Sequence, residues 1–259
     1  MKKNVLLVLG NGYNRENLIE SAIYLRDNLN FEIRPIHVRD VRKKEFLPNA
    51  IDGIMLEPMI ADINKEWTKY EDEEIIKIQK LLKDRGINSE LEIKYGITPE
   101  VVIQELKKSD MLLIEKEEKF TEDLIILMKK FFKPIIVVRD KPLKLEKIAI
   151  ANDDGTKVNK SFQRFSNIFN DIKEIDSLKL TEDSSEEEEN YLESFILNKN
   201  LKLNSKLFKK EDIDLFMEEC NKSDILIMGN LSSSYLFEKI TKKIGIKIME
   251  SVETTLFIA

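Results

Sequence analysis

Short apolar runs and longer amphipathic stretches alternate along the whole chain. The apolar runs are too brief for helices, and they are typical of strands buried on both faces, as in a parallel sheet between two layers of helices. In the first half, strands are predicted at 5–9, 33–38, 91–95, 111–114 and 135–138. In the second half, they are predicted at 148–151, 172–175, 201–208, 225–228 and 255–258.

The stretches between these runs carry apolar residues at the spacing of one helix face. Helices are predicted after the turns at 10–12 and 152–155, and at about 66–85, 100–108, 121–132, 212–221 and from 234. The segment 184–189, two serines followed by glutamates, predicts a serine-capped helix start, because the helix dipole favours carboxylates there.

The connection at 39–64 contains prolines but is too apolar for a disordered linker. Its part at 46–60 either covers the chain's own core or offers a contact surface to a partner. In the helix that follows this connection, Trp67 is expected to anchor the helix to the sheet.

One pattern occurs twice, as Lys-Ser-Asp followed by a strand, at 108–114 and again at 222–228. A spacing of roughly 100 residues or more is far longer than a solenoid unit, so it predicts two related domains. The polar segment 139–147 is the expected boundary, which gives domains at 1–140 and 146–259. Because parallel neighbours need crossover helices, each half should form its own doubly wound, parallel, five-stranded α/β sheet. Ligands of such sheets bind at the carboxyl ends of the strands, so the turns after the first and fourth strands deserve the closest inspection.

Composition narrows the classes of function. The 259 residues are 42% hydrophobic and 35% charged, with a net charge of -6, so no overall positive field favours nucleic acid or anionic lipid. The single cysteine, Cys220, excludes an internal disulfide, fits a reducing compartment and has the spacing of a core residue. The apolar run at 5–9 is shorter than a signal sequence needs, and no run is long enough to span a membrane, so we expect a cytoplasmic protein without membrane or nucleic-acid partners.

Several short features carry a resemblance to a known family: the turns at 8–12 and 151–155, the pair His37-Val38, the helix entry Gly96-x-x-Pro99 and the strand end at 224–229. With these features the chain resembles the universal stress protein family, as a tandem of two domains. The resemblance covers essentially the whole chain. It implies a Rossmann-like fold of the adenine nucleotide alpha hydrolase type with strand order 3-2-1-4-5. It also implies association of the domains through their last strands and, in some members, ATP binding.

ATP-binding members carry a loop Gly-x2-Gly-x9-Gly-Ser/Thr after the fourth strand, where glycines bring backbone N–H groups close to the phosphates. The first half has Glu-Lys-Glu-Glu-Lys at 115–119 instead. Two like charges about 4 Å apart repel by roughly 4 kcal/mol at an effective dielectric constant of about 20, and the lysines offset this only in part. We therefore predict that the first-half nucleotide site has been lost.

The second half keeps part of this loop. Gly229 stands at the first glycine position, Ser232 at the second, and Ser233 and Ser234 follow at a predicted helix start. These serines either cap the helix or, together with free N–H groups, hold a phosphate or another anion. Lysines at 242–243 replace the last glycine and hydroxyl, so the site is degenerate, and ATP is expected in this half if anywhere.

The pair Asp153-Asp154 follows the first strand of the second half. We interpret it as a turn in which Gly155 supplies a positive φ. The resemblance implies that one of these two acids meets an adenine amino group. The weak nucleotide- or anion-binding set is therefore Asp153, Asp154, Gly155, Gly229, Ser232, Ser233 and Ser234.

Catalytic signals are missing from the sequence. His37 is the single histidine, so a site with two histidine metal ligands cannot be built, and a structural role is expected for it. The sequence also lacks a recognisable Ser-His-Asp set and a Gly-x-Ser-x-Gly elbow. The favoured prediction is a non-catalytic stress-response or regulatory protein without cofactor or metal, acting on an unknown protein partner or by self-association. The alternatives are an ATP- or anion-responsive binding module that uses the second half and, least favoured, a slow ATPase.

Overall fold

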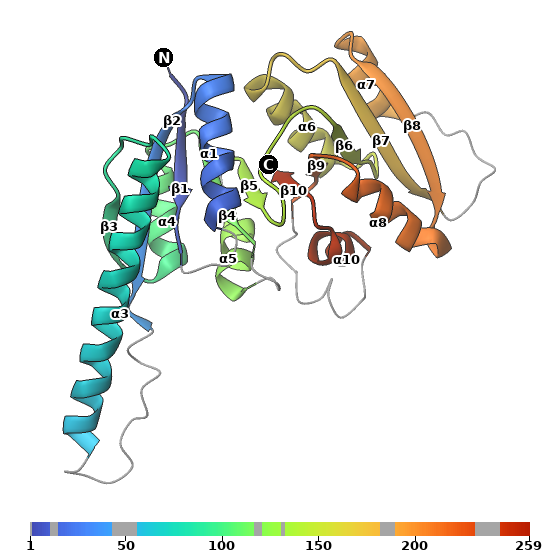
Figure 1. The fold of residues 1–259 in the computed structure, drawn as a ribbon. Coiled ribbons are helices and arrows are strands. Elements are labelled where there is room, and N and C mark those ends of the chain that lie inside the picture. Colours follow the sequence, from blue (N-terminus) through green and yellow to red (C-terminus); the bar gives the residue numbers. More distant parts are fainter. Residues whose placement is uncertain are drawn as a thin grey trace.

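The computed structural model describes residues 2–10, 15–42, 56–116, 121–130, 133–181, 190–230 and 244–259, and the side chains of 56–61 and 244–247 are not considered (Figure 1). The first half contains β1 (Asn4–Val8), α1 (Arg15–Leu29), β2 (Glu32–Asp40), α3 (Leu56–Asp84), β3 (Glu92–Gly96), α4 (Thr98–Leu106), β4 (Met111–Glu115), α5 (Glu122–Lys130) and β5 (Ile135–Val138). The second half contains β6 (Ile148–Ala151), α6 (Thr156–Ile168), β7 (Glu174–Thr181), α7 (Tyr191–Asn198), β8 (Lys202–Lys209), a 3-10 turn (Lys210–Asp212), α8 (Ile213–Asn221), β9 (Ile225–Met228), α10 (Ile244–Ser251) and β10 (Thr255–Ile258).

The strands of the two halves form one 10-stranded sheet, in the order β3-β2-β1-β4-β5-β10-β9-β6-β7-β8. Each half thus has the implied order 3-2-1-4-5, and the halves associate through their last strands, as the resemblance implied. The prediction of two separate five-stranded sheets was wrong, because β5 and β10 pair antiparallel, with Phe257 opposite Ile136. Both strands are buried and apolar, and an unpaired edge there would leave backbone N–H and C=O groups without partners.

The aspartate of the repeated Lys-Ser-Asp pattern makes the same backbone contact in both halves. The Asp110 carboxylate accepts a hydrogen bond from the N–H of Asn4 at 2.7 Å, and the Asp224 carboxylate accepts one from the N–H of Lys147 at 2.8 Å. Each aspartate therefore fixes the beginning of the first strand of its half next to the beginning of the fourth.

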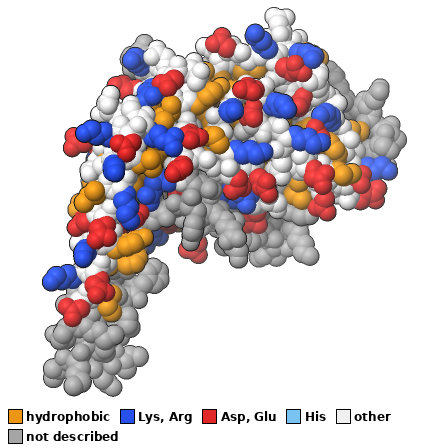
Figure 2. Space-filling model, in the orientation of Figure 1, with side chains coloured by type: hydrophobic (Ala, Val, Ile, Leu, Met, Phe, Trp, Pro, Cys, Tyr) orange, Lys and Arg blue, Asp and Glu red, His pale blue; other side chains and the backbone are white. Residues whose placement is uncertain are grey.

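Helices cover both faces of the sheet (Figure 1). One buried cluster joins side chains of α1, α6, α7 and the carboxyl-terminal part of α3 to one face, and a second cluster joins α4, α5, α8 and α10 to the other. Cys220 is completely buried in the second cluster, as its spacing predicted. In the view of Figure 2, positive and negative side chains are interspersed over the body of the molecule.

Several predicted elements differ from those observed. Helix α3 begins at Leu56 instead of about 66, and its amino-terminal part extends away from the sheet in Figure 1. Trp67 is 39% exposed and stacks on Tyr70 with ring centroids 6.0 Å apart, so the expectation that it anchors the helix to the sheet was wrong.

One strand of the second half also has other bounds than those predicted. Strand β7 spans Glu174–Thr181 instead of 172–175. Helix α7 begins at Tyr191, and Asn190 caps it by accepting a hydrogen bond from the N–H of Glu193. Residues 184–189, most of 46–60 and the predicted helix start at 234 lie outside the described residues. No helix in the described ranges combines the length and apolar character that a membrane span requires.

Candidate functional site

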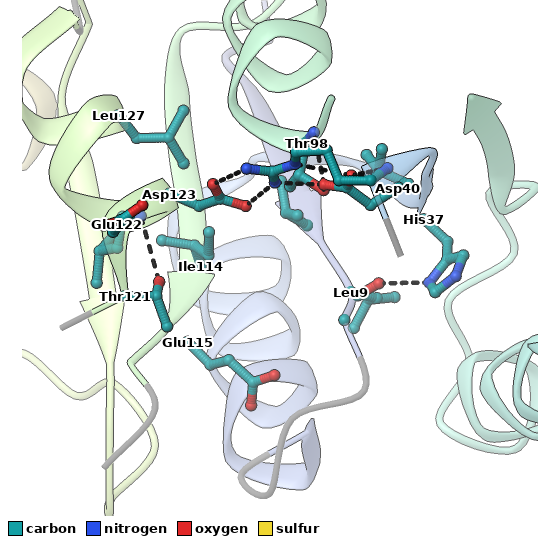
Figure 3. A pocket seen from close by; sticks show the side chains of 15 residues that line it. Leu9, His37, Asp40, Thr98, Ile114, Glu115, Thr121, Glu122, Asp123 and Leu127 are labelled. Carbon is teal, nitrogen blue, oxygen red and sulfur yellow. Dashed lines mark hydrogen bonds and ion pairs between the residues drawn. The ribbon is translucent and has the colours of Figure 1, made fainter. Parts of the chain in front are cut away.

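A cavity of about 620 Å³ opens at the carboxyl ends of the first-half strands (Figure 3). It lies where the strand order reverses between β1 and β4, which is the usual position of ligands in open α/β sheets. Its apolar wall comes from the ends of β1, β2 and β4 and from α5. The apolar lining residues are Val8, Leu9, Val38, Ile114, Leu124 and Leu127. A cavity of this size suits a small molecule.

A partly buried ionic cluster lines this cavity. The guanidinium of Arg42 donates to Asp40 at the end of β2 and to Asp123 in the first turn of α5, with Nε–Oδ1 and Nη1–Oδ1 distances of 2.9 Å each. Asp40 also accepts the N–H of Thr98 at 3.0 Å and its hydroxyl at 2.6 Å, so it caps α4. The cluster therefore ties β2, α4 and α5 together (Figure 3).

The cluster fixes the charge state of its members. Burial acts to raise the pKa of Asp40, but the hydrogen bonds from Arg42 and Thr98 outweigh it and hold that pKa well below its usual range. The same two carboxylates, Asp40 and Asp123, raise the pKa of Arg42 further above its usual range. Arg42 is thus a permanent cation whose donors are already directed at carboxylates.

Carboxylates line the part of the cavity between the end of β4 and the start of α5. Glu115 ends β4, and Glu122 and Asp123 form the first turn of α5; all three line the cavity. The positive end of the α5 dipole is therefore already matched by two acids. The acids expected at 117 and 118 lie outside the described residues.

His37 also lines the cavity, but it is buried, and its Nδ1 lies 2.7 Å from the carbonyl oxygen of Leu9. This contact joins β2 to the end of β1, in agreement with the structural role that was expected. Among the residues that the structure describes, no three His, Cys, Asp or Glu side chains are grouped in a way that could hold a metal ion.

The second half has different chemistry at the equivalent position. Asn152 corresponds to Leu9, since their N–H groups donate to the equivalent carbonyls of Leu178 and Ile36, at 2.8 and 2.9 Å. The buried Asn152 amide donates to Ser177 Oγ at 3.0 Å, and also to the capping oxygen of Asn190 at 3.1 Å. A polar network therefore connects the end of β6 to α7.

The predicted turn residues belong to this network. Asp154, not Gly155, has the positive φ, at 50°, while Gly155 has φ -75°, so that part of the prediction was wrong. The Asp154 carboxylate accepts the N–H groups of Tyr191 and Leu192 at 3.0 and 2.8 Å and thereby caps α7. Asp153 accepts the N–H of Gly155 at 2.9 Å.

Gly229 follows β9 and packs closely against the first turn of α6. A Cβ at this position would lie 3.0 Å from Cβ of Lys157 and 3.2 Å from the nitrogen of Val158. Close packing of strand and helix is thus sufficient to require glycine here. The other predicted members, Ser232, Ser233 and Ser234, lie outside the described residues.

The Asp40–Arg42–Thr98–Asp123 cluster was not predicted from the sequence. Arg42 and Asp123 are 81 residues apart, and Asp40 and Thr98 are 58 apart, so no local motif connects them. One available signal was an aspartate at the end of a predicted strand, and another was a threonine next to Pro99 at a helix start.

No family model and no curated protein matches the sequence. Among solved structures, a universal stress protein from Archaeoglobus fulgidus DSM 4304 has a similar fold, with a TM-score of 0.69 and 13% identity over 99% of this chain and 95% of that chain. A functionally unknown protein from Pseudomonas aeruginosa PAO1 is also similar, with a TM-score of 0.58 and 9% identity over 99% of this chain and 92% of that chain. At these identities the likeness concerns the fold: the chain has the fold of a universal stress protein, with the strand order of that fold present in each of its two halves.

Proposed function

We propose that this chain is a non-catalytic regulatory protein of the universal stress protein type, with tandem domains at 1–140 and 146–259. Its first-half nucleotide site has been lost, and its second-half site is degenerate. The carboxylates of Glu115, Glu122 and Asp123 in the first-half cavity are the observation that carries this proposal.

A triphosphate needs donors where these carboxylates lie. Phosphate sites at helix starts use free backbone N–H groups and the positive end of the helix dipole. At α5 the first turn carries two acids of its own, and Arg42, the described cation nearest to them, is bound to Asp40 and Asp123. Each like-charge pair at about 4 Å would oppose binding by roughly 4 kcal/mol at an effective dielectric constant of about 20.

Thermal unfolding of the purified chain with millimolar ATP and Mg²⁺ tests the proposal. A ligand at 100 times its dissociation constant stabilises a protein by roughly 2.7 kcal/mol, so an intact site would raise the melting temperature by several degrees. We expect no such shift. A shift of several degrees that is lost on substitution of Glu115 or Asp123 would contradict the loss of the first-half site.

A charge-matched pair of variants sharpens this test. The double variant Glu115→Gln/Glu122→Gln removes two carboxylates from the cavity and leaves the Arg42 cluster intact. The control Glu211→Gln/Glu253→Gln removes two carboxylates from exposed positions elsewhere. If carboxylates exclude the triphosphate, only the first variant should gain affinity for ATP, as measured by calorimetry.

The alternative is an ATP- or anion-responsive module that uses the second half. It is favoured by the start of α6, where the N-cap residue Gly155 offers no side-chain hydrogen bond to the helix and Gly229 packs against Lys157. Replacing Ser233 and Ser234 by Glu should abolish any ATP-dependent shift and leave the melting temperature of the free protein unchanged. A shift that persists in this variant would exclude these serines.

Catalysis is the least supported function. Both carboxylate oxygens of Asp154 accept N–H groups of α7, and Asp153 accepts the N–H of Gly155, so each of these acids already has a structural contact. We expect no phosphate release from ATP above background. Release that disappears in Asp153→Asn or Asp154→Asn would establish an ATPase.

The partner is proposed to be another protein or a second copy of this chain. The net charge of -6 disfavours nucleic acid and anionic membranes. Cys220 is a free, buried cysteine, and burial raises the pKa of its thiol to about 12, so it is not a reactive thiolate. A lone thiol of this kind fits the reducing environment of the cytoplasm.

A further inference from the structure

The carboxyl end of helix α10, in the second half, is held by two cations of the first half. Nζ of Lys116 donates to the carbonyl oxygens of Met249 and Glu250, at 2.8 and 2.6 Å. The guanidinium of Arg139 donates to the carbonyl oxygens of Glu250, at 3.3 Å, and Val252. The last carbonyls of a helix lack partners within the helix, and its dipole favours cations there.

The sheet fixes the positions of both cations. Lys116 directly follows β4, and its N–H donates to the carbonyl of Val138 at 2.7 Å. Arg139 directly follows β5, the strand that pairs with β10. Helix α10 lies beside this seam between the halves (Figure 1). The two strands of the first half therefore place two positive charges at one helix end of the second half.

Lys116 is an unusual residue for this position because it is only 2% exposed. Among the described residues, the charged groups that act on it from the surrounding elements include Arg139 and Asp140 after β5 and Glu250 on α10. Burial and the Arg139 charge lower the pKa of Lys116 to about 7, whereas Glu250 and Asp140 act in the opposite direction.

We propose that Lys116 is a proton-sensitive contact between the two halves, which holds α10 against the first-half strands most firmly when its amine is neutral. A neutral amine still donates two hydrogen bonds, so both carbonyls keep their partner. A charged amine gains from the helix dipole, but it must remain desolvated next to Arg139, and this cost is the larger of the two. Acidification therefore favours states in which α10 separates from the seam and Lys116 reaches water.

The direction of the pH dependence follows from proton linkage. With α10 separated, or the chain unfolded, the lysine has its ordinary pKa of 10.5, whereas in the closed seam its pKa is about 7. Between these values the open state holds one proton more, so the equilibrium constant for opening falls by up to tenfold for each unit of rising pH. Below about pH 7 both states are protonated, and the contribution is constant.

An NMR titration of the full chain, with lysine labelled at Cε, measures the protonation of Lys116 directly. We expect a midpoint near pH 7, and the variant Lys116→Met assigns the signal. Glu250→Gln should move the midpoint to lower pH, because it removes a carboxylate and keeps the backbone carbonyl. Arg139→Gln should move it to higher pH. A midpoint above pH 9, or no movement in Glu250→Gln, would refute the proposal.

Hydrogen exchange of the Ile248 and Val252 amides measures the opening of α10. After correction for intrinsic exchange, the protection of the wild-type chain should increase by up to tenfold per pH unit above pH 7. Lys116→Arg keeps a positive charge at all these pH values, so its protection should not change with pH. A pH profile in Lys116→Arg identical to that of the wild-type chain would show that another group is responsible. If Lys116→Met fails to fold, the Arg and Glu250 variants still decide the question.

Discussion

The two halves share a strand order and a repeated aspartate contact, yet they differ at the carboxyl ends of their strands. In the first half, Leu9 contributes to the apolar wall of a cavity. In the second half, the equivalent Asn152 is the centre of a polar network that reaches Asn190 at the start of α7. The comparison shows that the fold tolerates opposite chemistry at its usual ligand position, provided that every buried polar group has a partner.

The helices next to these positions differ as well. After the second strand, the first half has the 29-residue helix α3, whereas the second half has the 8-residue helix α7. Asp154 and Asn190 both cap α7, so the short helix is fixed at its beginning. Helix α3 is instead fixed in its carboxyl-terminal part, where Arg15 of α1 contacts Glu74 at 3.0 Å. At the carboxyl ends of its strands, the second half is thus linked to the start of a helix, whereas the first half has a cavity at the equivalent place.

Exchanging the two equivalent residues should have the largest effect. Asn152→Leu removes the hydrogen bonds that Asn152 makes with Ser177, Asn190 and the N–H of Asp154, and Leu9→Asn buries an amide in an apolar wall. Each change should lower the free energy of unfolding by about 3 kcal/mol or more. Urea unfolding measures both variants. A loss below about 1 kcal/mol in Asn152→Leu would mean that the network does not stabilise this half.

Removing Asp40 should have the next largest effect, because it frees Thr98 and leaves Arg42 with Asp123 as its one carboxylate partner among the described residues. Asp40→Ala should lower the free energy of unfolding by about 2–3 kcal/mol. The control Asp72→Ala breaks an ion pair of an exposed carboxylate with Arg39 and should have an effect below about 1 kcal/mol.

The contribution of Asp40 should also depend on pH. Its pKa is lower in the folded chain than the ordinary value of 3.8. The stabilisation is therefore complete above about pH 4 and is lost as the pH falls through the lower, folded value. Urea unfolding from pH 6 to pH 2 should show that the wild-type chain and Asp40→Ala become more alike in acid. A constant difference down to pH 2 would contradict this pKa shift.

Much of the fold could be predicted from local pattern, since strands such as β4 and β9 are short, apolar and preceded by the same Lys-Ser-Asp turn. The continuous 10-stranded sheet could not be predicted in this way. Nothing in the local sequence of β5 shows whether this strand ends a sheet or pairs with β10. The same limit applies to the site. Arg42 meets Asp123 only because the ends of β2 and the start of α5 come together in three dimensions. Glu115 was predictable at the cavity because it directly follows a repeated strand.

Gly229 and Glu115 stand at the same place in the repeat, directly after the apolar part of the fourth strand. Substituting these two residues should give a smaller difference in stability between the halves. Gly229→Ala should lower the free energy of unfolding by about 1–3 kcal/mol, because its Cβ would crowd Lys157 and Val158. Glu115→Ala should change it by less than about 0.5 kcal/mol. Equal, small effects in urea unfolding would mean that α6 moves easily and that the glycine is not required by packing.

Asp154 has two properties that different substitutions can separate, its positive φ and its capping carboxylate. Asp154→Gly keeps the backbone conformation and removes the cap, so it should lower the free energy of unfolding by about 1 kcal/mol. Asp154→Ala removes both and should lose roughly 1 kcal/mol more, since alanine is strained at positive φ. Asp153→Ala, which removes only a local contact with Gly155, should be milder than either variant. If urea unfolding gave the same value for the glycine and alanine variants, the cap alone would account for Asp154. If the glycine variant were as stable as the wild-type chain, the backbone conformation would account for it, and its carboxylate would be free to serve a ligand.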